Sequence, residues 1–225
     1  MRKLVTPLTL LTAALFAYVP VSIAGAPNEA TMGLVQKIFY FHVPAWMAMG
    51  AAIAVCGAAS TIHIFKNRPA ADRTAAAAAE LAVLFGVIGL VTGPLWGRKA
   101  WGHWWNWGDA RLTMALLLEL VFVSYLVVRA YGGPGSDKLA AAVGLFGTAL
   151  TPFVYVSVNL WRTVHPVTTV VPELMGGSMP GAGLPFTVSS AAFLLLCGLL
   201  LIVRIHLASR QATLDELYLA EDDGV

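Results

Sequence analysis

The chain has 225 residues, of which 58% are hydrophobic and 12% are charged, and its formal net charge at pH 7 is +2. Soluble domains usually carry about 25% charged residues, so this composition places the chain among integral membrane proteins. The small net charge and the absence of a basic run give no indication of a nucleic-acid partner.

Six apolar runs are long enough to cross the roughly 30 Å hydrocarbon core of a bilayer, which takes about 20 helical residues. In chain order they cover residues 4–24, 38–65, 75–95, 112–131, 139–160 and 184–207. Short breaks rich in lysine, asparagine, glycine and proline separate several of them. The sequence therefore predicts an all-α fold of six transmembrane helices, with a membrane domain over residues 1–210 and an acidic tail over residues 211–225.

The first run also has features of a secretory signal peptide, because Arg2 and Lys3 precede it and small residues follow it at 22–26. The apolar core of a signal peptide usually has about 7–15 residues, and this run is longer. We therefore expect it to be retained as a helix.

The lysines and arginines predict the orientation of the helices. With the N-terminus inside, nine of them face the cytoplasm: Arg2, Lys3, Lys66, Arg68, Arg73, Arg129, Lys138, Arg204 and Arg210. The other five face outward: Lys37, Arg98, Lys99, Arg111 and Arg162. This asymmetry follows the positive-inside rule and places both termini in the cytoplasm. In a bacterium the chain would be a multi-pass protein of the inner membrane, with the connection between helices 3 and 4 in the periplasm.

That connection is unusually rich in tryptophan. Five of the seven tryptophans fall within residues 96–107, namely Trp96, Trp101, Trp104, Trp105 and Trp107. Tryptophans at the membrane surface often only anchor helix ends. Five on one connection, with glycines between them, favour a surface that binds a large planar apolar ligand. Arg98, Lys99 and Arg111 supply cations for the carboxylates of such a ligand.

Two histidines lie on the same predicted side as this loop. His42 begins the second span, and His165 follows the fifth. A lone histidine near a helix end is usually an ordinary interfacial residue. Two beside a tryptophan-rich loop favour haem, since imidazole is a common ligand of haem iron and a macrocycle accepts one ligand on each face. Trp46 lies one turn beyond His42, while Trp161 and Arg162 precede His165 and could line the same site.

Residues 101–113 read WGHWWNWGDARLT and resemble the tryptophan-rich "WWD" signature of haem-handling proteins in cytochrome c biogenesis. The start of the second span, FHVPA at 41–45, and the region of His165 are similar to one branch of these proteins. This branch is the cytochrome c maturation protein C, or haem exporter protein C, family. The resemblance covers nearly the whole chain, from the first span to the sixth.

The resemblance implies a function. Proteins of this family bind haem b transiently on the periplasmic face and load it onto a membrane-anchored haem chaperone. They act beside an ATP-binding-cassette transporter and a small single-span subunit. By position, His42 and His165 match the axial ligands of the iron. The tryptophans of 101–107, together with Asp109, match the haem-contact motif, so we expect the haem-binding loop within residues 96–113.

The chain departs from the family pattern at two places. Gly108 separates Trp107 from Asp109, which leaves the direction of the Asp109 carboxylate open. Relatives carry an acid near the position of Ala115, whereas this chain has Glu119 one helical turn further on. An intramembrane carboxylate suggests function, although a hydrogen bond between helices would also account for it.

Other functions stay open from the sequence. The chain could move haem through the bilayer as a transporter, or carry electrons as a bis-histidine b-type cytochrome. It could also be a structural subunit whose loop docks a partner. No hydrolase or kinase motif and no catalytic set is present, so any enzymatic role is at most an accessory one in haem transfer.

Overall fold

The computed structural model describes residues 2–29, 32–161 and 181–222, and this part of the chain is helical. Its α-helices are α1 (Arg2–Ala24), α2 (Phe39–Lys66), α3 (Pro69–Trp101), α4 (Ala110–Tyr131), α5 (Ser136–Leu160) and α7 (Gly183–Asp222). A short 3-10 helix, η1 (Leu34–Ile38), leads into α2. Among the described residues, α1, α2 with η1, α3, α4 and α7 are long and apolar enough to span a membrane. The chain is thus an all-helical membrane protein. The sixth expected span lies within α5 and stays a prediction.

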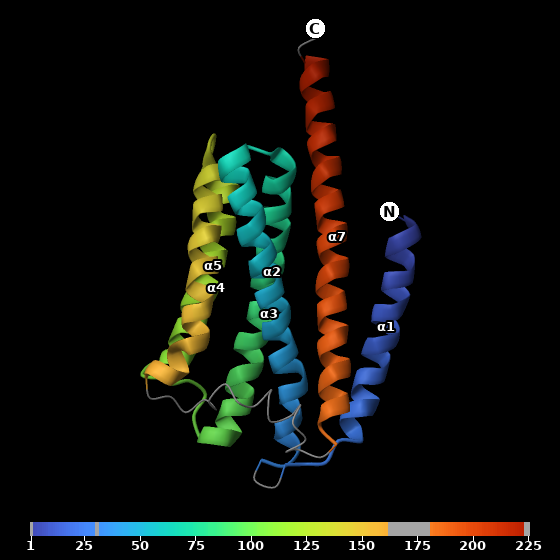
Figure 1. The fold of residues 1–225 in the computed structure, drawn as a ribbon, viewed down its shortest axis with the longest axis vertical. Helices are drawn as coiled ribbons and strands as arrows, with labels where there is room; N and C mark the ends of the chain where they lie inside the picture. Colours follow the sequence, from blue (N-terminus) through green and yellow to red (C-terminus); the bar gives the residue numbers. More distant parts are fainter. Residues whose placement is uncertain (1, 30–31, 162–180, 223–225) are drawn as a thin grey trace.

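The helices are arranged around the α2–α3 hairpin (Figure 1). α2 and α3 make the most extensive contact of any described pair; α4 and α5 pack on one side of the hairpin, and α7 packs on the other. α1 lies outermost, against α7. The beginning of α1 and the end of α7 lie toward the end of the bundle that carries the α2–α3 turn (Figure 1). The α3–α4 connection and the beginnings of α2 and α7 lie at the opposite end, called here the outer end.

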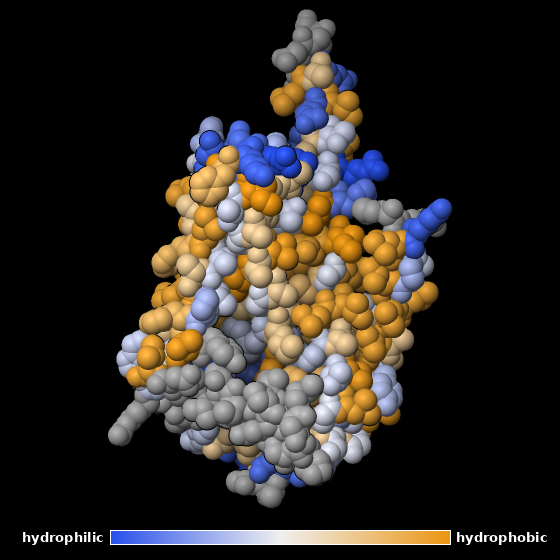
Figure 2. All heavy atoms as spheres, viewed as in Figure 1, coloured by the Kyte–Doolittle hydropathy of each residue, from blue (hydrophilic) through white to orange (hydrophobic). Residues whose placement is uncertain are grey.

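Small residues line the contact between the central helices. Buried alanines of α2 face buried alanines of α3, which allows the two backbones to approach closely: Ala45, Ala48, Ala52, Ala75, Ala78, Ala79 and Ala82. Phe85, Phe122 and Tyr125 fill the space toward the neighbouring helices. Large apolar side chains also point outward, and Figure 2 shows them as a broad belt around the visible face. This pattern is typical of a surface that faces lipid.

Cys56 and Cys197 are both buried free thiols within this packing. Both belong to the apolar core of the bundle.

Ion pairs join the helices toward the end that carries the α2–α3 turn. Arg129 of α4 forms a bidentate pair with Asp72 of α3, with Nη2 and Oδ2 2.9 Å apart. Arg204 of α7 forms another with Glu80 of α3, at 2.5 and 2.6 Å. Each pair ties α3 to a different neighbour.

Two helices extend beyond the limits expected from the apolar runs. α3 continues from the expected limit at 95 to Trp101, and α7 continues to Asp222. At 1.5 Å per residue, helices of 33 and 40 residues are about 50 and 60 Å long, well beyond the hydrocarbon core. The apolar runs end where the membrane ends, but helical hydrogen bonding continues past that point. Residues 96–101 are therefore helix and not loop, and the described part of the tail continues α7 without a break.

We predict that Asp72→Asn lowers the free energy of unfolding by about 1–3 kcal/mol, because it leaves the largely buried Arg129 guanidinium without its charged partner. Thermal or denaturant unfolding in detergent measures the effect. Asp215→Asn is the matched control, since Asp215 is exposed near the end of α7 and its carboxylate accepts a hydrogen bond from the exposed Gln211. Equal losses in both variants would show that the Asp72–Arg129 pair does not stabilise the bundle.

Candidate functional site

His42 lies in the first turn of α2 at the outer end and is half-buried against α3. Its Nδ1 lies 2.9 Å from Oγ1 of Thr92 on α3. Two indoles meet the imidazole edge to face, Trp46 with ring centres 6.2 Å apart and Trp96 with ring centres 5.8 Å apart. The ring is thus held by groups from both central helices before any ligand is added.

Two glycines of α3 make room for this arrangement. A β-carbon on Gly89 would collide with the Trp46 indole, and one on Gly93 would come within 3.2 Å of His42 Cε1. Gly89 and Gly93 are one helical turn apart on α3, as His42 and Trp46 are on α2, so each ring packs on glycine backbone. Thr92, Gly89 and Gly93 belong to no motif that the sequence alone indicates. The spacing of Gly86, Gly89, Gly93 and Gly97 along one helix was the signal that could have shown a close approach.

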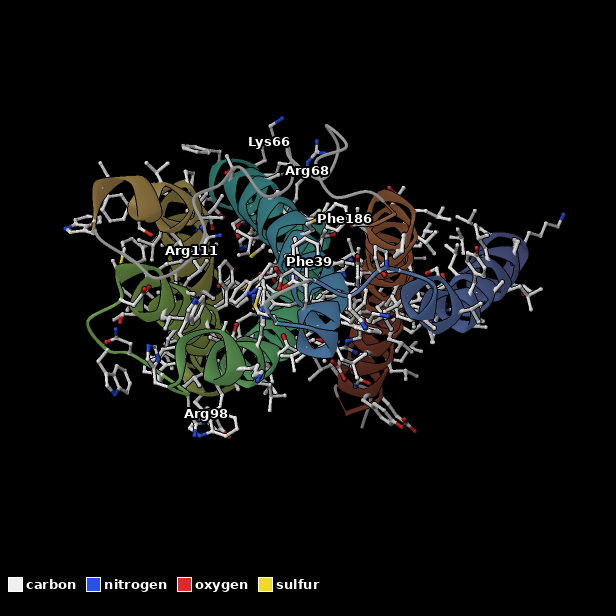
Figure 3. The ribbon with its side chains drawn as sticks, turned by 90° about the horizontal axis from the view of Figure 1, so that it is seen from below. Phe39, Lys66, Arg68, Arg98, Arg111 and Phe186 are labelled. Atoms are coloured by element: carbon white, nitrogen blue, oxygen red, sulfur yellow. The ribbon has the colours of Figure 1, made fainter. Side chains whose placement is uncertain are left out.

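Trp96 belongs to the packed interior of the outer end. Its Nε1 donates to Sδ of Met32 at 3.3 Å, and its ring meets Phe39 edge to face at 6.1 Å. Phe39 in turn stacks on Phe186 of α7 at 5.4 Å, and Figure 3 shows these two residues next to each other. Trp96 therefore links α3 to the aromatic contact between α2 and α7, and its indole is largely covered by these neighbours.

The remaining tryptophans of the loop fall into two groups. Trp101 closes the last turn of α3, with its ring 3.0 Å from the β-carbon position of Gly97, and α3 ends at Gly102 with a φ of 81°. Trp104 and Trp107 are 57% and 72% exposed, whereas Trp105 is half-buried with its ring 5.7 Å from that of Trp107. The five indoles thus differ in exposure, and Trp104 and Trp107 are the most exposed of them.

Asp109 is the N-cap of α4. Its side chain is only 2% exposed and accepts a hydrogen bond from the Leu112 backbone N–H at 3.1 Å. Asn106 holds the preceding turn, because its Oδ1 accepts from the Gly108 N–H at 3.0 Å and its carbonyl from the Asp109 N–H at 3.1 Å. Gly108 is therefore part of the turn that directs the Asp109 carboxylate into the helix start. This geometry gives Asp109 a structural role as the cap of α4, while its contact with a ligand stays a prediction.

The cations of the outer end are separated. Arg98 and Lys99 are exposed, and Arg98 Nη1 donates to the Gly102 carbonyl at 2.5 Å. Arg111 is half-buried in the first turn of α4. Figure 3, which views this end of the bundle, shows Arg98 at its margin and Arg111 well away from it. One ligand carboxylate therefore cannot be expected to meet both.

Three expected site residues lie at or after the end of α5. Trp161 is the C-cap residue of α5; it is 49% exposed and meets Phe153 edge to face at 5.6 Å. Arg162 and His165 lie outside the described residues.

Glu119 is a buried carboxylate of α4, 4% exposed, that lies against Gly86 of α3. Both of its oxygens lack a hydrogen-bond partner among the described residues. Gly86 precedes Gly93 by seven residues, so Glu119 lies about two helical turns from the level of His42. It belongs to the packing of α3 with α4 and not to the surroundings of His42.

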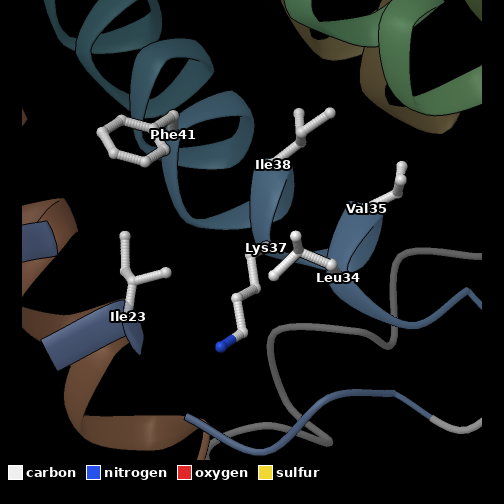
Figure 4. A pocket seen from close by; sticks show the side chains of 6 residues that line it. All are labelled: Ile23, Leu34, Val35, Lys37, Ile38 and Phe41. Atoms are coloured by element: carbon white, nitrogen blue, oxygen red, sulfur yellow. The ribbon is translucent and has the colours of Figure 1, made fainter. Parts of the chain in front are cut away.

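An open hollow of about 380 Å³ lies between the end of α1 and the beginning of α2 (Figure 4). Its lining is apolar apart from Lys37, whose ammonium donates to the Ala24 carbonyl at 3.2 Å. Phe41 lines this hollow while the adjacent His42 faces α3, because successive residues of a helix point about 100° apart. The hollow is therefore separate from the histidine site.

The fold and the site together define a multi-pass helical membrane protein with an imidazole and exposed indoles at one end of the bundle. The sequence pattern of the heme exporter protein C family matches residues 1–217. The Heme exporter protein C of Bradyrhizobium diazoefficiens is 38% identical over 189 residues, which cover 82% of this chain and 68% of that protein. The Heme exporter protein C of Escherichia coli K12 is 33% identical over 186 residues, covering 80% and 73%.

A cytochrome c biosynthesis ccmC-like mitochondrial protein of Marchantia polymorpha is 33% identical over 150 residues, which cover 66% of this chain and 63% of that protein. The chain belongs to the heme exporter protein C family. It is a multi-pass membrane protein of haem export in cytochrome c biogenesis, and the family expected from the sequence is confirmed.

We predict that Asp109→Ala lowers the free energy of unfolding by about 0.5–2 kcal/mol, whereas Asp109→Asn leaves it nearly unchanged, because asparagine caps a helix as well as aspartate does. Denaturant unfolding of the haem-free protein measures both. Haem affinity, measured on the same two variants, separates the cap from a ligand contact. Loss of affinity in the stable Asp109→Asn variant would assign the carboxylate charge to the ligand.

Proposed function

We propose that this protein binds haem b at the outer end, on the periplasmic side, and transfers it to a membrane-anchored haem chaperone. The observation that carries the proposal is the setting of His42. A half-buried imidazole, fixed by Thr92 and two indoles, lies at the same end of the bundle as the exposed Trp104 and Trp107. In this reading His42 and His165 bind the iron from opposite faces.

The chemistry of the described residues suits haem. A neutral imidazole is a ligand for iron, and exposed indoles offer flat apolar surface to a porphyrin. Arg98 and Lys99 are exposed cations within reach of solvent, where the haem carboxylates would lie. Arg111 lies apart from Arg98, on α4. It would therefore pair with the other haem carboxylate or with neither.

The same features suit transfer more than permanent storage. Trp104 and Trp107 lie largely in solvent, so haem resting on them stays accessible to a second protein. Haem that is held by an imidazole of fixed position presents the same edge to each acceptor protein. Transfer would then depend on the orientation of the haem. The chaperone, an ATP-binding-cassette transporter and a small single-span subunit are the partners that this function requires. The bacterial inner membrane is the location it implies.

Glu119 is the one observation that favours a second candidate function, passage of haem through the bilayer. Its carboxylate lacks hydrogen bonds among the described residues and lies deep in the bundle. However, it is packed against Gly86 and next to Met49, so its surroundings resemble a helix contact and not a haem pathway. Glu119→Gln should therefore leave haem delivery unchanged, whereas a transport role requires it to fall.

We predict that the His42→Ala, His165→Ala double variant purifies with much less haem than the unchanged chain, by more than tenfold. Pyridine haemochrome absorbance normalised to protein measures the content. His103→Ala is the matched control, because His103 lies in the same outer loop and has no assigned role. Equal haem in the double variant and the unchanged chain would refute axial ligation by these histidines.

We also predict that Trp104→Leu, Trp107→Leu weakens haem binding without lowering stability, because both indoles are mostly exposed in the haem-free fold. At about 0.5–1.5 kcal/mol per ring, the dissociation constant should rise by about fivefold to a hundredfold. Haem titration followed by absorbance measures the affinity. Tyr131→Leu, an exposed aromatic at the opposite end, is the control. Unchanged affinity would show that the exposed indoles do not contact haem.

A further inference from the structure

We propose that Thr92 is a positioning residue that fixes the tautomer of His42, with the proton on Nδ1 and the lone pair on Nε2. The inference rests on the proposed function in so far as Nε2 is then the atom offered to haem iron. Nothing in the sequence motif points to Thr92, which lies 50 residues from His42 and in the middle of a helix.

The Thr92 hydroxyl has a single hydrogen and three neighbours within hydrogen-bond distance. Its Oγ1 lies 2.7 Å from the carbonyl oxygen of Ile88, 3.3 Å from that of Gly89 and 2.9 Å from His42 Nδ1. The two carbonyl oxygens can only accept, and the Ile88 contact is the shortest of the three, so we assign the hydrogen to Ile88. With that assignment the contact with His42 uses a lone pair of Oγ1, and Nδ1 is the donor.

The consequence for the imidazole follows directly. A neutral imidazole carries one N–H, so a proton on Nδ1 leaves Nε2 with the lone pair that a metal ligand needs. The opposite tautomer would place a second acceptor against Thr92 Oγ1 while its hydrogen is already used. It could form only if Thr92 gave up the bond to Ile88.

The residues around His42 keep its imidazole ring in contact with the Thr92 hydroxyl. Gly93 lies on one side, with its β-carbon position 3.2 Å from His42 Cε1, and the indoles of Trp46 and Trp96 meet the ring edge to face. Turning the ring over would bring a carbon to the Thr92 hydroxyl in place of Nδ1 and lose the hydrogen bond. Thr92 and Gly93 thus form the wall of α3 that sets both the direction and the tautomer of the imidazole.

The chemistry of Thr92, the hydrogen-bond partner of His42, also affects how readily haem would be released. Metal-binding histidines commonly donate their second N–H to a carboxylate or a carbonyl, and such partners raise the basicity of the ligand and orient it. A hydroxyl that is already a donor is a weaker acceptor than a carboxylate. Thr92 therefore orients His42 without making it a strong ligand, which suits haem that must be passed on.

The first test needs no haem. The full chain is labelled with ¹⁵N-histidine in detergent micelles, and the two ring nitrogens of His42 are assigned by loss of their signals in His42→Ala. At a pH where the ring is neutral, we expect the Nδ1-protonated pattern in the unchanged chain and in Thr92→Ser. Thr92→Val keeps the shape and removes the hydroxyl, and it should give a mixture of tautomers or the opposite one. An Nε2-protonated ring in the unchanged chain, or no change in Thr92→Val, would overturn the inference.

The second test uses the haem-loaded chain. Loss of the hydrogen-bond partner of a metal-binding histidine typically weakens metal affinity by about tenfold to a hundredfold. We expect Thr92→Val to weaken haem binding by about tenfold and to shift the reduction potential, with recovery in Thr92→Ser. Melting temperatures of the three haem-free chains exclude misfolding. If the potential and the affinity of Thr92→Val match those of the unchanged chain, Thr92 does not act on the ligand. If the His42 and His165 variants keep their haem, the proposed function fails, and the ¹⁵N spectra still decide the tautomer.

Discussion

The close approach of α2 and α3 is the constraint on which the outer site depends. Buried alanines allow the two backbones to approach each other closely along the membrane-spanning part. Lipid tails are as apolar as the side chains, so the hydrophobic effect does not drive helices together in the membrane, and their contact depends on close packing. Toward the outer end glycine replaces alanine on α3, and the space gained is filled by Trp46 and His42. The same contact that holds the bundle thus determines where the imidazole points.

The sequence predicted the helices better than their ends. Apolar runs identify the segments that enter lipid, because the cost of burying charge there is large. These runs do not indicate at which residue a helix ends once the chain has left the membrane. Trp96 shows the consequence: a dense tryptophan segment suggested a loop, but its first part is helix and packs on Met32 and Phe39. The end at Gly102 depends on local backbone conformation, which the apolar pattern does not contain.

The role of His42 as an iron ligand stays a prediction. His42 could be chosen from the sequence because it and His165 are expected on the same side of the membrane as the tryptophan-rich loop. Thr92 could not, since a hydroxyl bonded to its own helix is unremarkable until tertiary contact brings Nδ1 beside it. Asp109 shows the converse. The motif suggests a ligand contact, whereas the asparagine turn before it directs the carboxylate to cap α4.

These placements divide the outer end into a fixed part and an accessible part. His42, Trp46 and Trp96 are held by helix packing, so their geometry is set without a ligand. Trp104 and Trp107 are largely exposed. In the proposed haem transfer, an acceptor protein that offers its own apolar surface would replace the contacts of the porphyrin with these indoles, whereas the bond from His42 to the iron would be broken in a separate step. A ligand of modest basicity, backed by a hydroxyl, lowers the barrier to that last step and so favours transfer over retention.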